Sequence, residues 1–180
     1  MEKELIEELG LGLYAAYQQS LVIEPITNSY PDITIKDAYS IQLQTLDKRL
    51  DSGEKIIGKK IGVTSSAVMN MLGVAQPDFG HLTDKMLYED GAEIKQNSFI
   101  QPKAEGEIAF VLKKDLMGPG VTIVDVLNAT EGVMACFEIV DSRIRDWDIK
   151  IQDTVADNAS CGAFVLASSM VSLQGLDVRH

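Results

Sequence analysis

The chain has 180 residues, 46% of them apolar and 24% charged, with a formal net charge of −11. This composition is that of a folded globular protein with one sizeable core, not of a disordered chain. The negative charge makes nucleic acid and anionic lipid poor partners, because both repel an acidic protein. It does not exclude a small acidic substrate, since a local cation can override the overall field.

No apolar stretch approaches the ~20 residues that a membrane helix requires, and we expect no membrane partner. The N-terminal segment MEKELIEELG is acidic and lacks the basic flank and apolar stretch of a signal peptide. Cys136 and Cys161 are the only cysteines, and both have apolar or small neighbours. They predict reduced core thiols in a cytoplasmic protein, with a disulfide or a ligand role as the less favoured alternative.

The first part of the chain carries helical patterns. Apolar residues recur at helical spacing in residues 3–19 and predict an amphipathic helix. Residues 24–32 contain two prolines and indicate a loop. Thr34 followed by Asp37 resembles a capping box, and it predicts a second helix that runs to about Leu50.

Past residue 55 the pattern changes to short strands and short helices. The segment SAVMNMLGV predicts a helix that closes at Gly73, Thr122 and Asp125 predict the start of another over about 122–130, and AQPDFGHLTDKM indicates a loop. Strands are predicted in KIIGKKIGVTS, near residues 86–88, 92–94, 107–112 and 133–140, and in GAFVLAS. This order predicts an α+β fold, with an N-terminal helical region over residues 1–54 and a β-rich core of mixed strands over residues 55–180.

Three glutamates interrupt segments that otherwise have the pattern of buried strands. Glu105 and Glu107 precede the stretch IAFVL, and alternation along a strand places both side chains on one face. Glu138 lies within VMACFEIVD, a second apolar segment. Buried carboxylates need a nearby cation, and Mg²⁺ and Mn²⁺ prefer carboxylate oxygens. The pattern favours a divalent metal site, and its alternative, solvated glutamates or lysine pairs at a sheet edge, stays open.

Four further side chains could take part in catalysis or in substrate binding. Lys60 lies between two glycines in GKKIGVTS, where a lysine in a tight apolar site can transfer protons, although a solvated lysine is the commoner case. Asp78 in QPDFG suits a general acid or base, or a residue that caps a turn. Arg143 and Arg145 are expected to form surface ion pairs, with a clamp on a substrate carboxylate as the alternative.

Five motifs together resemble one family. They occur in the order and spacing of the 2-hydroxypentadienoate hydratases (2-keto-4-pentenoate hydratases), in the hydratase/decarboxylase branch of the fumarylacetoacetate hydrolase superfamily. The motifs are GKKIGVTS, GVAQPDFGHL, QPKAEGEIAFVL, EIVDSRIRDW and DTVADNASCGAF. Each is weak alone, but their agreement over residues 30–168 makes the resemblance specific.

The resemblance implies a β-rich core of fumarylacetoacetate hydrolase type that holds a divalent metal, Mg²⁺ or Mn²⁺. The site residues that it implies are three metal ligands, Glu105, Glu107 and Glu138, and three catalytic residues, Lys60, Asp78 and Ser160. Family members continue beyond the segment LQGLDVRH that ends this chain, so the resemblance also implies a core that is incomplete at the C-terminus.

The reaction that the resemblance implies is hydration of 2-hydroxypenta-2,4-dienoate to 4-hydroxy-2-oxopentanoate, in the meta-cleavage degradation of aromatic compounds. The substrate would be a small dienol or 2-oxo acid, and the enzyme a cytoplasmic homo-oligomer that associates with other enzymes of the pathway. Two alternatives are a 4-oxalocrotonate decarboxylase of the same branch and a non-catalytic partner subunit or fragment.

Overall fold

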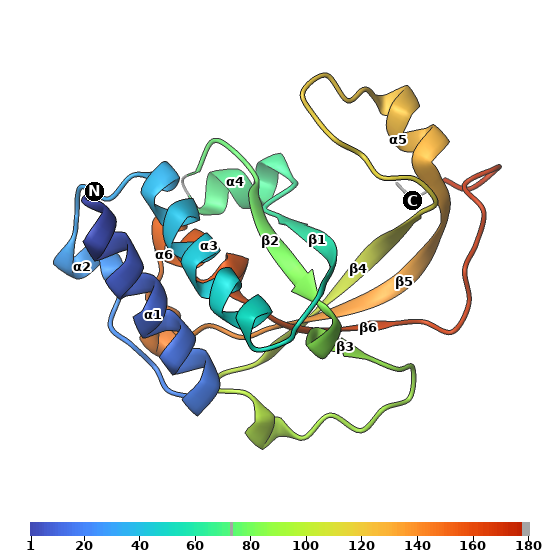
Figure 1. Cartoon of the computed structure of the whole chain (residues 1–180). Coiled ribbons are helices and arrows are strands. Elements are labelled where there is room, and N and C mark those ends of the chain that lie inside the picture. Colours follow the sequence, from blue (N-terminus) through green and yellow to red (C-terminus); the bar gives the residue numbers. More distant parts are fainter. Residues whose placement is uncertain (73, 178–180) are drawn as a thin grey trace.

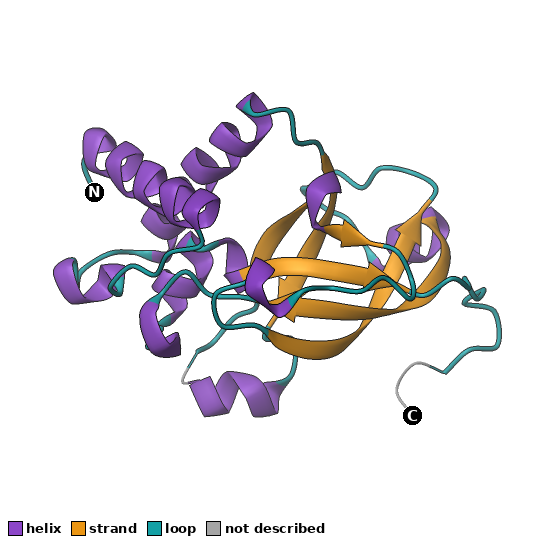
Figure 2. Ribbon diagram, turned by 90° about the horizontal axis from the view of Figure 1, so that it is seen from below, coloured by secondary structure: helices purple, strands orange, loops and turns teal. Residues whose placement is uncertain are grey.

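The structure, a computed structural model, describes residues 1–72 and 74–177. Most of its helices gather at one end of the molecule and its strands lie toward the other, where one short helix, α5 (Ile123–Ala129), also lies, as Figures 1 and 2 show. The helical end is built from α1 (Lys3–Gln19), α2 (Ile26–Ser29), α3 (Ile35–Asp51) and α6 (Ile151–Ala156). The mixed α+β architecture predicted from the sequence is therefore confirmed. None of the helices in the described part of the chain is long and apolar enough to cross a membrane.

Capping explains where two of the predicted helices begin. The Thr34 hydroxyl accepts a hydrogen bond from the Asp37 amide at 3.1 Å, and the Asp37 carboxylate accepts one from the Thr34 amide at 3.1 Å. Thr122 and Asp125 form the same reciprocal pair at the start of α5 (Ile123–Ala129). Each box satisfies amide groups that a helix leaves unpaired at its first turn.

The strands form two sheets. A two-stranded antiparallel sheet contains β1 (Ile56–Gly62) and β2 (Asp78–Thr83), which are linked through α4 (Ser66–Leu72). A four-stranded sheet has the order β3-β6-β5-β4. Its members are β3 (Leu87–Tyr88), β4 (Lys103–Leu112), β5 (Thr130–Val140) and β6 (Cys161–Leu166). Short 3₁₀ turns, η1 (Asp84–Met86), η2 (Gln96–Ser98), η3 (Arg145–Trp147) and η4 (Asn158–Ser160), join these elements.

Two local predictions were wrong. The segment predicted as a loop around Asp78 forms β2, because its backbone pairs along its whole length with β1. Residues 92–94 form no strand. The helix end predicted at Gly73 lies outside the described residues.

The stretch IAFVL was predicted to be buried, and this was also wrong. Ile108 is 46% exposed and Phe110 is 48% exposed. The physical reason is position, since β4 is an edge strand that pairs only with β5 in the described sheet. Glu105 and Glu107 point to the other face of this strand and are themselves exposed, so they do not lie in the centre of a core.

The helical end shares its core with segments from late in the chain. Leu13 and Ile41, from α1 and α3, pack in one cluster with Ile144, Val155 and Ala156. Gln42 strengthens the junction, because its side-chain amide donates to the Phe79 carbonyl at 2.9 Å and to the Val155 carbonyl at 2.7 Å. The boundary at residue 54 stays a prediction. Cys136 and Cys161 are both free thiols, the latter buried, as predicted.

The two arginines of DSRIRDW differ in environment. Arg145 is exposed and pairs with Glu24 at 2.5 Å, as predicted. Arg143 was predicted to be at the surface, and this was wrong, because its guanidinium is buried against Asp157 with an Nε–Oδ1 distance of 2.5 Å. A second nitrogen of Arg143 donates to the Asp157 carbonyl at 2.8 Å. This pair anchors the segment just before η4.

We predict that Asp157→Ala lowers the free energy of unfolding by about 3–5 kcal/mol, because it leaves the Arg143 charge buried without its partner. Arg145→Ala is the matched control, since it removes an exposed ion pair and should change stability by less than about 1 kcal/mol. Urea denaturation followed by circular dichroism measures both. Equal effects of the two variants would contradict the structural role of the buried pair.

Candidate metal and acid–base site

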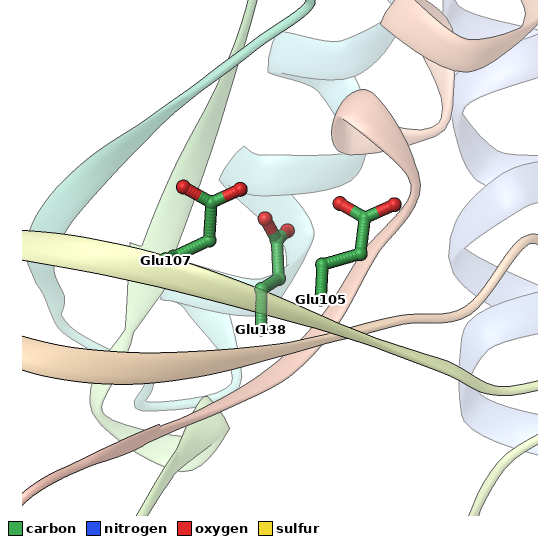
Figure 3. A group of neighbouring side chains, drawn as sticks. All are labelled: Glu105, Glu107 and Glu138. Carbon is green, nitrogen blue, oxygen red and sulfur yellow. The ribbon is translucent and has the colours of Figure 1, made fainter. Parts of the chain in front are cut away.

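The strand register brings the three predicted glutamates together. Glu105 on β4 lies directly opposite Glu138 on β5, and Glu107 follows two residues later on the same face as Glu105. Each carboxylate contributes an oxygen to a group whose members all lie within 4.8 Å of one another. Figure 3 shows the three side chains rising side by side from the same side of the two strands.

This arrangement is costly without a cation, and its donor set fits a hard divalent metal. Glu138 is buried, and its Oε1 accepts no well-aligned hydrogen bond within the described residues, although the Lys60 ammonium lies 3.2 Å away in an ion pair. Burial raises the pKa of Glu107, and the charges of Glu138 and Glu105 raise it further. Three carboxylates that repel one another and have a single ammonium group against them are ligands that Mg²⁺ or Mn²⁺ would accept.

Lys60 lies beside this cluster on β1. Its Nζ is 3.2 Å from Glu138 Oε1 in an ion pair and donates a hydrogen bond to the Ala159 carbonyl at 3.0 Å. Burial alone lowers the pKa of Lys60, but the neighbouring Glu138 carboxylate, together with Cys161 and Asp78, raises it above its ordinary value. Lys60 is therefore held as an ammonium group, a cation and proton donor, and the solvated-lysine alternative is wrong.

Asp78 begins β2 and lies opposite Gly62 in the β1–β2 pair. Its side chain is buried, and its Oδ1 also lacks a hydrogen-bond partner in the part of the chain that the structure describes. Burial raises the pKa of Asp78, and the Lys60 charge opposes this effect. A methyl group placed on Gly62 would lie 2.2 Å from Asp78 Oδ1 and 3.4 Å from Lys60 Nζ, so glycine is required there.

Ser160 ends the turn η4, which carries three successive residues in the left-handed region. The φ angles of Asn158, Ala159 and Ser160 are 56°, 52° and 53°. The Asn158 side chain fixes this turn to β2, since it accepts from the His81 amide at 2.8 Å and donates to the His81 carbonyl at 2.9 Å. Backbone strain of this kind persists only where surrounding contacts impose it.

All six predicted site residues line one cavity of about 340 Å³. The cavity has further walls that were not singled out as site residues from the sequence, made by Ile61, Val63, Val140, Trp147 and Thr154. Alternation along β5 gives a signal for Val140, because it lies two residues from Glu138. No periodic sequence pattern could have predicted Trp147 or Thr154 as cavity residues, because Trp147 lies in the turn η3 and Thr154 lies in the short helix α6.

The fold and the cavity define a class of protein. A mixed-strand core presents a cluster of carboxylates that could hold a metal ion next to a lysine and a buried aspartate, and the cavity is of a size to admit a small molecule. Such a site is suited to metal-assisted acid–base chemistry on a small anionic substrate.

Comparison with known proteins narrows this class. The chain is 62% identical to 2-hydroxypent-2,4-dienoate hydratase of Pseudomonas putida over 179 residues, which cover 99% of this chain and 81% of that protein. It is 59% identical to 2-hydroxyhexa-2,4-dienoate hydratase of Comamonas testosteroni over 98% of this chain and 68% of that protein. The chain therefore belongs to the 2-hydroxypentadienoate hydratase family, as its motifs predicted. No protein-family model matches it.

A solved structure supports the fold assignment. The 4-oxalocrotonate decarboxylase from Pseudomonas putida G7, in complex with magnesium and adipate, aligns with a TM-score of 0.94 and 35% identity over 99% of this chain and 68% of that chain. The same enzyme has been solved with calcium and acetate, at a TM-score of 0.92. The predicted fold of fumarylacetoacetate hydrolase type is confirmed.

We predict that replacing any of the three clustered glutamates by glutamine weakens Mg²⁺ or Mn²⁺ binding by about tenfold or more, because each change removes a charged ligand. Isothermal titration calorimetry measures the affinity. Glu131→Gln is the matched control, since Glu131 also lies on β5 but is exposed and paired with Lys113. Unchanged affinity in the three cluster variants, with folding intact, would exclude the metal site.

Proposed function

We propose that this chain is a metal-dependent hydro-lyase that converts 2-hydroxypenta-2,4-dienoate and water to 4-hydroxy-2-oxopentanoate in the breakdown of aromatic compounds. The observation that carries the proposal is the convergence of Glu105, Glu107 and Glu138 beside Lys60 and Asp78 in one cavity. Hydratases of this substrate class are the relatives with 62% and 59% identity.

Glu105, Glu107 and Glu138 would hold Mg²⁺ or Mn²⁺. When bound, the metal supplies Lewis acidity that stabilises negative charge on the oxygen at C2 of the substrate. The protein groups then have separate tasks. Glu138 holds Lys60 at the edge of the cluster through their ion pair, and Ser160 orients the substrate carboxylate with its hydroxyl.

Proton transfer falls to Lys60 and Asp78. In the first step the Lys60 ammonium delivers a proton to C5 and takes up the hydroxyl proton that the dienol loses, which gives a conjugated 2-oxo-3-enoate. In the second step Asp78 takes a proton from water as the water oxygen bonds to C4, and then gives that proton to C3. The unpartnered Asp78 Oδ1 supports this assignment, since it offers an acceptor that the fold leaves unused.

A second candidate is decarboxylation of 4-oxalocrotonate, favoured by the structural similarity to the decarboxylase. One experiment distinguishes hydration, decarboxylation and a non-catalytic role. The purified chain is incubated with Mg²⁺ and freshly generated 2-hydroxypenta-2,4-dienoate, and in parallel with 4-oxalocrotonate. Loss of dienol absorbance with formation of 4-hydroxy-2-oxopentanoate supports hydration, and CO₂ release from 4-oxalocrotonate supports decarboxylation. Metal binding without either reaction would support a non-catalytic subunit.

We further propose that the protein acts in the cytoplasm as a homo-oligomer and associates with other enzymes of the pathway. Exposed apolar side chains on β4, β5 and α5, among them Phe110, Phe137 and Ile123, support the existence of an interface. Two free cysteines agree with a reducing compartment. Size-exclusion chromatography with light scattering tests the oligomer, and a monomer at micromolar concentration would contradict it.

We predict that Lys60→Met lowers kcat for the dienol by a factor of about 10²–10⁴, because the variant lacks the proton donor. Lys59→Met is the matched control, as Lys59 is the exposed neighbour on the same strand. Steady-state absorbance kinetics measures both. Equal kcat values in the two variants would remove Lys60 from the mechanism.

Gly62→Ala gives an independent test of the Asp78 position. The added methyl would lie 2.2 Å from Asp78 Oδ1, so the carboxyl group must move. We predict a loss of about 10²-fold in kcat/KM with metal affinity preserved, since a displacement of this size disrupts the reacting geometry. Gly58→Ala is the control on the same strand, because its methyl meets only the Leu82 side chain at 3.4 Å.

A further inference from the structure

Thr154 has a place in the cavity that the proposed reaction does not use. It lies on α6, two residues before the end of the helix, and its Oγ1 is 2.9 Å from Ser160 Oγ. Both residues line the cavity that holds the glutamate cluster. Thr154 is half-buried and Ser160 is buried. The two hydroxyl groups therefore form a hydrogen-bonded pair at the wall of the site.

Hydrogen bonds hold both the amide and the carbonyl group of Ser160 in place, so the remaining freedom of its hydroxyl group is rotation about the side-chain bonds. Its amide donates to the Asp157 carbonyl at 3.0 Å, and its carbonyl accepts from the Asp141 amide at 2.7 Å. Its φ of 53° lies in the small left-handed region, which leaves a residue other than glycine little room for change in backbone conformation. The direction of the Ser160 O–H bond then depends on the partner of its oxygen.

The Thr154–Ser160 pair has one hydroxyl proton that is not used in the hydrogen bond between the two oxygens. Each hydroxyl has one donor and two acceptor positions, so the pair contains two protons and uses one between the oxygens. When Thr154 donates to Ser160 Oγ, the Ser160 proton points elsewhere, toward a ligand in the cavity. An ionised carboxylate is acceptor-only and therefore selects this direction.

We propose that Thr154 is a positioning residue that donates to Ser160 Oγ and so directs the Ser160 hydroxyl proton to the carboxylate of the bound 2-oxo acid. This rests on the proposed function for the class of ligand. The carboxylate is unchanged during hydration, so the interaction is equally strong before and during the reaction. Its loss raises KM and leaves kcat nearly unchanged.

Thr154→Val tests the proposal, because valine keeps the shape of threonine and removes the hydroxyl. The probe is 2-oxopentanoate, a saturated 2-oxo acid, titrated calorimetrically in the presence of Mg²⁺. We expect Thr154→Val to weaken binding by about tenfold and to raise KM by a similar factor, as loss of one hydrogen bond to an anion site implies. Thr154→Ser should restore affinity to within about twofold, because it retains the donor.

A double-variant comparison separates positioning from direct contact. If Thr154 acts through Ser160, Thr154→Val has no further effect in a Ser160→Ala background. Thr45→Val is the structural control, since the Thr45 hydroxyl donates to the Gly10 carbonyl at 3.0 Å in the helical region, away from the cavity. It should lower stability without changing the affinity for 2-oxopentanoate.

Several outcomes would overturn the proposal. They are unchanged affinity in Thr154→Val, failure of Thr154→Ser to restore it, fully additive effects with Ser160→Ala, or no binding of 2-oxopentanoate by the unmodified protein. A different result would contradict the proposed function. A protein that binds 2-oxopentanoate but leaves the dienol unchanged would contradict hydration, while the comparison of variants would still decide the role of Thr154.

Discussion

Repulsion among carboxylates in a small cavity is the constraint on which the rest of the site depends. Glu138 is buried, and the register of β4 against β5 places Glu105 directly opposite it. Lys60 is the cation that the described residues bring against Glu138, and it offsets only part of the negative charge. A divalent cation offsets the remainder, so a grouping that would destabilise the sheet alone becomes favourable when metal binds.

The acid–base groups are held by close backbone approaches rather than by a deep apolar core. A methyl group on Gly80 would lie 2.7 Å from the Asn158 carbonyl and 2.9 Å from Lys60 Cγ. Glycine at this position therefore allows the left-handed turn η4 to reach β2, where it offers the Ala159 carbonyl to Lys60. The buried pair of Arg143 and Asp157 anchors the other end of the turn. Local strain is tolerated because these contacts impose it.

The sequence predicted the elements with strong local signals. The capping residues Thr34 and Thr122 marked helix starts, and alternation placed Glu105 and Glu107 on one face. Features that depend on tertiary pairing were not predictable in this way. The segment at Asp78 has the residues of a turn but pairs as a strand, Arg143 is buried because Asp157 reaches it, and IAFVL is exposed because β4 is an edge. The resemblance to a family, not periodicity, assigned roles to Lys60, Asp78 and Ser160.

The chain is similar both to hydratases and to a decarboxylase, and a physical argument favours hydration as the proposed reaction. Both reactions place negative charge on the oxygen at C2, and in the proposed mechanism the glutamate cluster with Lys60 would serve that step equally well in each. Hydration also needs an acceptor for a proton from water, whereas loss of CO₂ does not. In the proposed mechanism Asp78 would be that acceptor, since its Oδ1 is buried without a hydrogen-bond partner among the described residues. An unsatisfied buried carboxyl oxygen costs a fold about 1–3 kcal/mol, and the proposed role in proton transfer would account for that cost.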